Sequence, residues 1–329
     1  MTMKTYHHWI NGAYQPPASG AFFDSVDPYR DEVWAQFARG NETDANLVVE
    51  AARTAMTVGP WATMSATERG KILRRIGDAV LDQVDHLAHL EVRDSGKLLS
   101  EARIQIKAKA EFWYYYAGLA DKIEGSVMPL EKADVFGFTL REPVGVVLAL
   151  TAWNAPLTFI ALKCAPALAA GCSVVIKPSE FTSASSLEFA SLTKAAGLPD
   201  GVLNVVTGYG AEIGAALVDH PKVAHVSFTG SDTNGAKIYA AAAKGMKGVT
   251  MELGGKYPNI VFADADLELA AAGALTGIFG AAGQMWAAGS RLFVQNTIKD
   301  KFVSMLMERA KTIKLGNPLD ATTQMGPIA

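Results

Sequence analysis

The stretch VGVVLALTAWNAPLTFIALKCAPALAAGCSVVIKPS, residues 144–179, decides the fold because it reads as strand, helix and strand in one short run. Strands buried on both faces form continuous β-branched apolar runs, and a helix between two such strands builds a parallel sheet. The same alternation continues to VAHVSFTG, residues 223–230, and the helix after it. The sequence therefore predicts an α/β fold with a doubly wound, nucleotide-binding parallel sheet across residues 144–251.

Two segments before this core carry apolar residues at helical spacing. Residues 43–58 and 66–95 are predicted helices, with Thr43 and Thr67 as expected caps, so we assign residues 1–123 to an N-terminal helical part of the same domain. Residues 124–143 alternate polar and apolar side chains, which predicts a β-hairpin arm.

Composition limits the classes of partner. The 30 basic and 33 acidic residues give a net charge of -3 without long like-charge runs, so we expect no nucleic acid and no membrane as partner, but a small molecule. The N-terminus lacks the apolar run of a signal peptide, and two cysteines in an apolar region suit reduced thiols, so we expect a cytoplasmic protein. His86 and His89 have no third ligand spaced with them, so no metal site is expected.

Glycines follow the predicted strand at 223–230 and point to a phosphate site. Gly230, Ser231 and Gly235 stand where the strand ends and a helix opens. Glycine lets backbone N–H groups approach a phosphate, and a helix N-terminus favours negative charge. A purely structural turn needs the same glycines, and the spacing differs from GxGxxG, so both interpretations stay open.

Two other strand ends carry polar side chains. In KPSE, residues 177–180, Lys177 suits a ribose or phosphate oxygen and Glu180 suits ribose hydroxyls, whereas the alternative is an exposed turn with an ordinary ion pair. Asn154 follows the strand before it, where its amide suits a developing oxyanion or simply a turn.

A single glutamate follows an apolar run near the end of the core. Glu252 in VTMELGGKYPNIVF, residues 249–262, is expected in apolar surroundings that raise its pKa towards neutrality, as a general base for water requires. The alternative is a strand terminus whose carboxylate pairs with Lys256.

The order of these motifs resembles the NAD(P)-dependent aldehyde dehydrogenase superfamily across essentially the whole chain. The most specific matches are ELGGK, residues 252–256, followed by GQ at 283–284 and GSR at 289–291. In this family a cysteine thiolate attacks the aldehyde, hydride passes to NAD(P), and a glutamate-activated water hydrolyses the thioester. The resemblance implies oxidation of an aldehyde to a carboxylic acid, and a homo-oligomer.

Carried onto matching positions, the resemblance implies that Asn154 and the backbone N–H of residue 286 hold the oxyanion, and that Glu252 activates water. The repulsion between Glu180 and a 2′-phosphate favours NAD, with NADP kept as the alternative. The residues implied to bind the cofactor are Thr151, Ala152, Trp153, Lys177, Glu180, Gly210, Gly230, Ser231, Gly235 and Leu253.

Two departures from the family pattern concern the catalytic part. The nucleophile position, two residues after Gln284, holds Trp286, whose indole is a donor and no nucleophile. The chain stops at TTQMGPIA, residues 322–329, where family members continue, so residues 252–329 are expected to be the truncated start of an α/β catalytic domain. Two hypotheses follow: an aldehyde dehydrogenase by lineage, inactive through Trp286, or a catalytically silent dinucleotide-binding or subunit-interaction protein.

Overall fold

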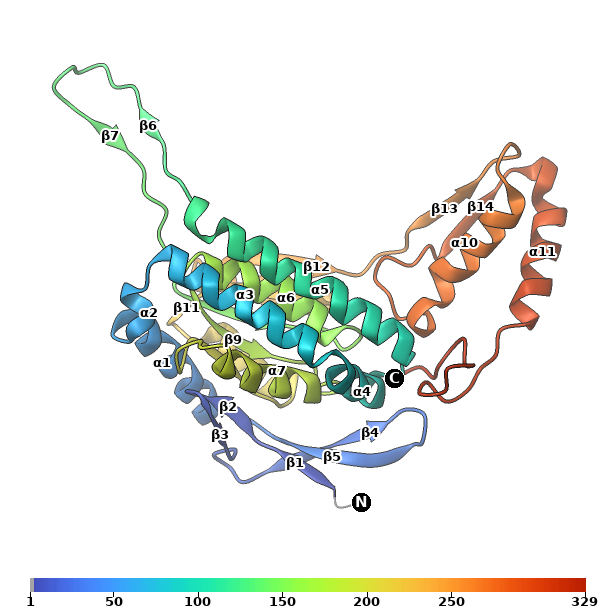
Figure 1. Ribbon diagram of the computed structural model, residues 1–329, viewed down its shortest axis with the longest axis horizontal. Coiled ribbons are helices and arrows are strands. Elements are labelled where there is room, and N and C mark those ends of the chain that lie inside the picture. The colour runs from blue at the N-terminus through green and yellow to red at the C-terminus, as the bar shows by residue number, and fades with distance from the viewer. Residues whose placement is uncertain (1–2) are drawn as a thin grey trace.

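A seven-stranded sheet forms the centre of the computed structural model, which describes residues 3–329 (Figure 1). Its strand order is β12-β11-β8-β9-β10-β2-β3, and the first five strands of that order run parallel. The predicted doubly wound parallel sheet is confirmed. The five parallel strands are β8 (Val146–Leu150), β9 (Ser173–Lys177), β10 (Leu203–Val205), β11 (Val223–Gly230) and β12 (Gly248–Leu253).

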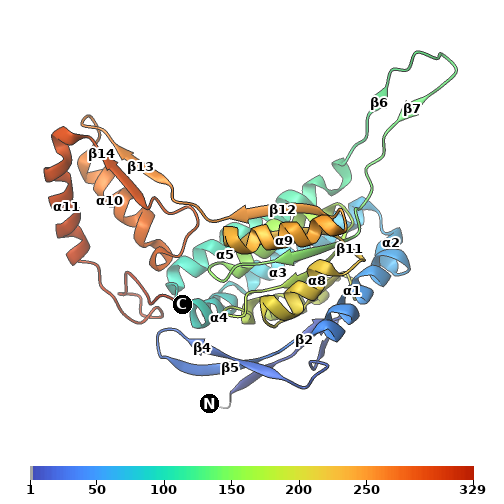
Figure 2. The same ribbon diagram turned by 180° about the vertical axis from the view of Figure 1, so that it is seen from behind.

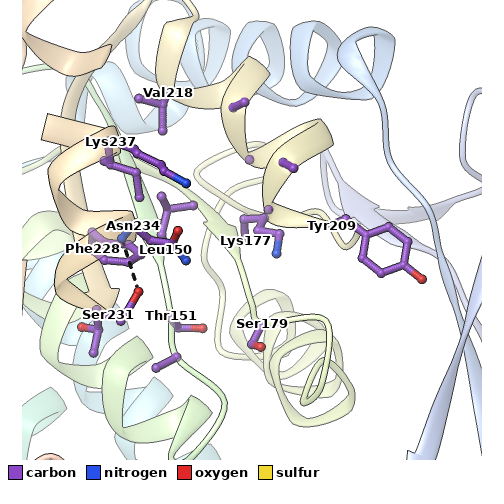
Figure 3. Close-up of a pocket in the computed structure, with 18 of the residues that line it drawn as sticks. Leu150, Thr151, Lys177, Ser179, Tyr209, Val218, Phe228, Ser231, Asn234 and Lys237 are labelled. Carbon is purple, nitrogen blue, oxygen red and sulfur yellow. Dashed lines mark hydrogen bonds between the residues drawn. The ribbon is translucent and has the colours of Figure 1, made fainter. Parts of the chain in front are cut away.

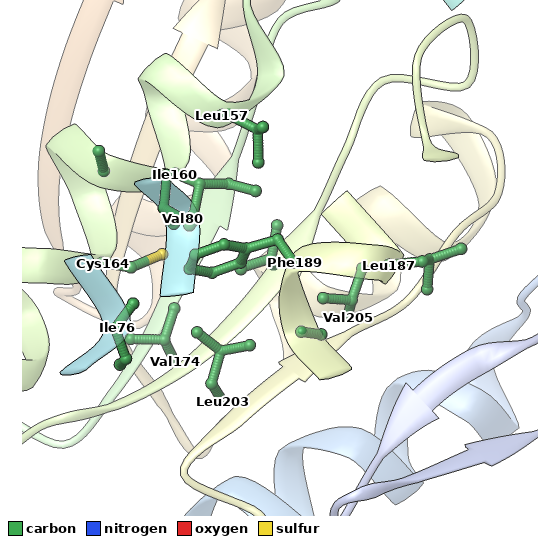
Figure 4. Packing of buried hydrophobic residues seen from close by; sticks show 14 of the residues in the cluster. Ile76, Val80, Leu157, Ile160, Cys164, Val174, Leu187, Phe189, Leu203 and Val205 are labelled. Atoms are coloured by element: carbon green, nitrogen blue, oxygen red, sulfur yellow. The ribbon is translucent and has the colours of Figure 1, made fainter. Parts of the chain in front are cut away.

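Helices cover both faces of this sheet (Figures 1 and 2). One face carries α3 (Ala66–Asp82), α4 (Val84–Ser95), α5 (Leu99–Leu119), α6 (Pro156–Ala169) and α7 (Ala184–Ala195). The other carries α1 (Glu42–Thr57), α8 (Ala215–Asp219) and α9 (Asp232–Lys244), and the short α2 (Pro60–Thr63) follows α1. Figure 4 shows part of the larger core, where Phe189 of α7 joins one cluster with Cys164 of α6, Ile76 of α3 and Val174 of β9.

The first forty residues depart from the predicted helical part, because they form strands. A three-stranded sheet has the order β1-β5-β4, while β2 and β3 extend the main sheet through the antiparallel pairing of Trp9 with Val205. The Asn11-Gly12 pair between β2 and β3 is a typical sequence signal for a tight hairpin turn. Both residues have positive φ in the structure, as such a turn requires. The strands are β1 (Lys4–Tyr6), β2 (His8–Ile10), β3 (Ala13–Gln15), β4 (Phe22–Asp27) and β5 (Glu32–Ala38).

The predicted helices between residues 43 and 95 exist, but their ends differ. Asn41 caps α1 in place of Thr43, because its side chain accepts hydrogen bonds from two backbone N–H groups. Ser65 caps α3 in place of Thr67, with its Oγ 3.2 Å from the Glu68 nitrogen. The predicted helix over 66–95 is two helices, because the chain leaves helical geometry at Gln83 (φ -110°, ψ 15°).

The hairpin expected within residues 124–143 is present and extends away from the main sheet (Figure 1). Beyond β12, two parallel strands and two helices form a smaller α/β unit. No helix within residues 3–329 is long and apolar enough to cross a membrane. The elements are β6 (Val127–Met128), β7 (Gly137–Phe138), β13 (Pro258–Val261), α10 (Leu267–Phe279), β14 (Arg291–Val294) and α11 (Lys299–Lys311).

A buried carboxyl group ties the N-terminal sheet to the central layers. Asp94, near the end of α4, accepts hydrogen bonds from Ser25 Oγ of β4 and from the Ala184 nitrogen at the start of α7, both at 3.0 Å. Burial raises the pKa of Asp94 to about 7 and outweighs these hydrogen bonds, which lower it. The folded protein therefore holds this proton to higher pH than the unfolded chain does.

We predict that the Asp94 carboxyl group makes the free energy of unfolding fall as pH rises. Its contribution is fully present below the ordinary pKa of 3.8 and is lost as pH rises to about 7. Asp94→Asn removes this part of the pH dependence, which is on the order of 4 kcal/mol because each pKa unit of the shift from 3.8 to about 7 is worth about 1.4 kcal/mol. Urea unfolding of the parent and Asp94→Asn proteins at pH 4.5 and 7.5 measures this effect. The prediction is contradicted if the unfolding free energies of the two proteins differ by the same amount at both pH values.

Candidate active site

A cavity of about 690 Å³ lies beyond the carboxyl ends of β8, β9 and β11 and is bounded by α8 and α9 (Figure 3). Its volume is within the range of about 300–1,000 Å³ typical of small-ligand sites, and its position is where α/β sheets bind ligands. The structure brings eight of the ten predicted cofactor-binding residues to its wall: Thr151, Ala152, Trp153, Lys177, Glu180, Gly210, Gly230 and Ser231.

The other two predicted residues, Gly235 and Leu253, lie outside the cavity lining. A Cβ on Gly235 would stand 2.7 Å from Leu253 Cδ2, so the glycine lets α9 pack closely on β12. Both residues act in packing the helix that bounds the cavity, which was the structural alternative for this glycine.

Lys177 is the charged group set deepest in the cavity wall. It ends β9 with only 5% of its side chain exposed, and its Nζ lies 3.3 Å from Glu180 Oε2. Burial lowers the pKa of Lys177, while the nearby Glu180 raises it. The alternative of an exposed turn is therefore wrong for Lys177, whose side chain is buried and lines a cavity.

The start of α9 and two strand ends present polar groups to the same space. Ser231 Oγ caps α9 by accepting from the Asn234 nitrogen at 3.3 Å. A Cβ on Gly230 would meet the Phe228 ring at 2.4 Å, so only glycine fits there without a shift. Thr151 and Thr229 also line the cavity, and their hydroxyl oxygens are buried without a partner among the described residues.

Some lining residues were not found from the sequence. Asn234, Lys237, Ile238 and Ala241 face the cavity from α9, and Tyr209 closes another side (Figure 3). Spacings of three and four residues along the predicted helix would have identified this face from Ser231 onward. Only the opening of this helix carried a sequence signal strong enough to be singled out.

The loops that carry Asn154 and position 286 are in direct contact. Asn154 Nδ2 donates to the Gln284 carbonyl oxygen at 2.6 Å, and Trp153 Nε1 donates to Gln284 Oε1 at 3.3 Å. Trp286 follows two residues later with 45% of its surface exposed. The structure therefore brings the predicted oxyanion donor beside the predicted nucleophile loop.

Glu252 occupies a different environment from the one expected. It lies within β12, the edge strand of the main sheet, and is exposed, because alternate residues of β12 face the core. The expectation of apolar surroundings is therefore wrong. Within residues 3–329, the expected partner Lys256 donates only to the Gly255 carbonyl oxygen, at 3.4 Å.

A buried lysine lies near Glu252. Lys163 of α6 donates from Nζ to Ser227 Oγ of β11 at 3.0 Å. Burial lowers the pKa of Lys163 to about 8, against opposing effects of Cys164 and Glu252, which raise it. Among residues 3–329, no group of three His, Cys, Asp or Glu side chains is arranged to hold a metal.

The sequence profile described as "Aldehyde dehydrogenase family" matches residues 14–329. The chain belongs to the aldehyde dehydrogenase family. The predicted resemblance is thereby confirmed, and so is the α/β fold, since solved aldehyde dehydrogenases superpose closely on this structure.

Individual aldehyde dehydrogenases support this assignment. The chain is 45% identical over 326 residues to (Z)-2-((N-methylformamido)methylene)-5-hydroxybutyrolactone dehydrogenase of Acinetobacter baylyi, covering 99% of this chain and 66% of that protein. It is 46% identical to aldehyde dehydrogenase family 2 member C4 of Arabidopsis thaliana, covering 97% and 64%. Betaine aldehyde dehydrogenase from Staphylococcus aureus, solved in complex with NAD+, matches with a TM-score of 0.96 and 42% identity, covering 98% and 64%. The chain thus spans about two thirds of each relative.

We predict that this aldehyde dehydrogenase fold gains stability when Lys163 loses its charge. The unfolded chain keeps the proton up to the ordinary pKa of 10.5, whereas the folded one releases it near 8, so the cost of burial is full below pH 8 and is removed as pH rises to 10.5. Lys163→Met should raise the unfolding free energy at pH 7 by about 2 kcal/mol, net of the lost hydrogen bond.

Urea unfolding at pH 7 and pH 9.5 measures this gain, with the exposed Lys301→Met as matched control. The gain should shrink at the higher pH. A Lys163→Met protein less stable than its parent at both pH values would show that the buried charge is net stabilising.

Proposed function

We propose that this chain binds NAD in the cavity at the ends of β8, β9 and β11. The observation that carries the proposal is the buried amine of Lys177, set with the N-terminus of α9 around one cavity at the strand ends. A dinucleotide supplies the anionic pyrophosphate and the ribose hydroxyls that such groups bind. The solved relative from Staphylococcus aureus was crystallised with NAD+, which supports the same ligand here.

The orientation of the ligand follows from the two ends of the cavity. Thr151 and Trp153 adjoin the loop of Asn154, so the nicotinamide belongs at that end. Lys177 and Glu180 would then hold the adenosine ribose, and the α9 N-terminus the pyrophosphate. The Glu180 carboxylate repels a 2′-phosphate, which favours NAD over NADP.

For the chemistry, we propose descent from an enzyme that oxidises an aldehyde to a carboxylic acid. NAD, when bound, accepts the hydride. Asn154 would donate to the developing oxyanion together with the backbone N–H of residue 286, and the exposed Glu252 would take a proton from water. The acyl-transfer step needs a thiolate at position 286, and Trp286 supplies none.

A second function, catalytically silent binding of the dinucleotide or of another subunit, is favoured by two observations. Trp286 removes the nucleophile, while Cys164 and Cys172 are buried in the core and do not replace it. The hairpin arm also exposes apolar side chains, among them Val127, Phe136 and Leu140, to which a second copy of the chain would be a fitting partner. We therefore propose a homo-oligomer built through residues 124–143.

We predict measurable NAD binding that depends on Lys177. Lys177→Met should weaken the affinity at least about tenfold, the value of one lost hydrogen bond between a charged group and a ribose hydroxyl. Titration calorimetry measures it, with Lys301→Met as control for loss of one surface charge. Equal affinity of the Lys177→Met and parent proteins, or undetectable binding at millimolar NAD, contradicts the proposed site.

We predict that the chain forms no aldehyde-dependent NADH and that Trp286→Cys forms NADH in a single turnover at most. The thiol restores the nucleophile, and its smaller side chain removes the indole. Trp286→Ser is the matched control, since it removes the same bulk without supplying a thiol. Stopped-flow absorbance with a panel of aldehydes measures NADH. Formation by the parent chain that is lost in Glu252→Gln would show that Trp286 does not block the reaction.

A further inference from the structure

The backbone just before position 286 has an unusual conformation. Ala281, Ala282 and Gly283 all lie in the left-handed region, with φ of 50°, 56° and 79°. Both alanines are buried. Residues with a Cβ adopt this conformation at a cost and keep it only where their surroundings fix it. Something outside the loop must therefore hold residues 281–283.

Glu101, on the first turn of α5, makes the contact that does so. Its Oε1 accepts a hydrogen bond from the Ala281 nitrogen at 3.0 Å, across 180 residues of chain. Its Oε2 accepts from the Leu98 nitrogen at 3.3 Å, which fixes the carboxylate at the start of the helix. A charged acceptor on a rigid helix thus satisfies the first of the left-handed residues.

The same part of the molecule holds the facing loop. Glu91 Oε1 accepts from the Leu157 nitrogen at 3.0 Å, three residues after Asn154. Lys97 Nζ lies 2.6 Å from Glu91 Oε2, and this pair is buried, with side chains 1% and 2% exposed. We call residues 91–101 the α4–α5 elbow. This elbow is hydrogen-bonded to the loop of Asn154 through Glu91 and to the loop of position 286 through Glu101.

The two loops meet at the site itself. The Gln284 carbonyl oxygen accepts from Asn154 Nδ2 at 2.6 Å, and Gln284 stands directly after the left-handed residues and two before position 286. The orientation of the Gln284 carbonyl depends on the turn that Glu101 supports. Two hydrogen bonds, one at Ala281 and one at Gln284, therefore connect Glu101 to Asn154 through the backbone of residues 281–284.

We propose that Glu101 is a positioning residue: it holds the 281–284 turn so that the Gln284 carbonyl oxygen meets Asn154 Nδ2, two residues before position 286. This inference rests on the proposed function in one respect, namely that position 286 is the nucleophile position. In this proposal Glu101 does not touch the reacting atoms, and it acts on the site through the backbone of residues 281–284. A helix-capping role alone would involve Leu98 and leave the turn unaffected.

The first experiment uses the chain with its own Trp286. Hydrogen exchange is followed by mass spectrometry in Glu101→Ala, in Glu101→Gln, which keeps an acceptor oxygen, and in Glu111→Ala, an exposed glutamate on the same helix. Exchange of residues 280–286 should quicken at least about tenfold in Glu101→Ala, the value of a hydrogen bond to a charged acceptor. It should stay within twofold, roughly, of the parent in the other two.

Faster exchange confined to residues 98–105 in Glu101→Ala, with 280–286 unchanged, would reduce Glu101 to a helix cap and overturn the proposal. Equal acceleration in Glu101→Gln and Glu101→Ala would do the same, because the glutamine retains an acceptor.

The second experiment asks whether Glu101 acts on the site. In a Trp286→Cys background, iodoacetamide reports on one thiol, because Cys164 and Cys172 are buried and burial raises the pKa of Cys164 to about 12. The alkylation rate is measured across pH with and without Asn154→Ala, in each case with and without Glu101→Ala. The Asn154→Ala change should alter the rate at least about threefold with Glu101 present and less than about 1.5-fold in the Glu101→Ala protein.

Asn154→Ala effects of equal size in both backgrounds would show that the two residues act independently, and would overturn the proposal. Thiol alkylation needs neither aldehyde nor NAD, so its outcome is separate from the proposed activity. Coupled alkylation without NADH formation would support the positioning role and contradict the proposed reaction.

Discussion

The parallel hydrogen-bond register of β8, β9 and β11 is the constraint on which the site depends. Leu150 pairs with Lys177 on one side and with Phe228 on the other, so β8 and β9 end at the same level and β11 ends two residues further on, at Gly230. Every residue that follows such a strand end must emerge at one edge of the sheet. Lys177, Thr151 and Gly230 therefore surround one cavity, although up to 79 residues separate them, the difference between positions 151 and 230.

This register also explains which parts of the fold were predictable. Strands buried on both faces, such as Val146–Leu150 and Ser173–Lys177, need continuous apolar runs, so their sequences are distinctive. A three-residue strand such as His8–Ile10 is too short to show a period in its sequence, although all three residues are buried, and its place beside β10 depends on residues far along the chain. The starts of α1 and α3 were misplaced by two residues because Asn41 and Ser65, and not the threonines two residues later, accept from the first free backbone N–H groups.

The candidate site was predictable only in part, for a related reason. A lysine or glycine after a strand is an ambiguous signal alone, and its meaning came from the order of motifs along the chain. Glu252 shows the limit: its neighbours in sequence are apolar, but β12 is an edge strand that turns alternate residues to solvent. Glu101 lay wholly beyond sequence reasoning, since its partner Ala281 is 180 residues away and contributes only a backbone N–H.

The frame of the site is independent of the side chain at position 286. The α4–α5 elbow is held by the buried pair of Lys97 and Glu91, and the cofactor cavity by strand ends, neither of which uses residue 286. Trp286 is nearly half exposed and belongs to none of the core clusters among residues 3–329. A substitution at position 286 therefore leaves the contacts that fold the chain in place. The proposed loss of the nucleophile would accordingly leave the cavity intact, because the two rest on different contacts.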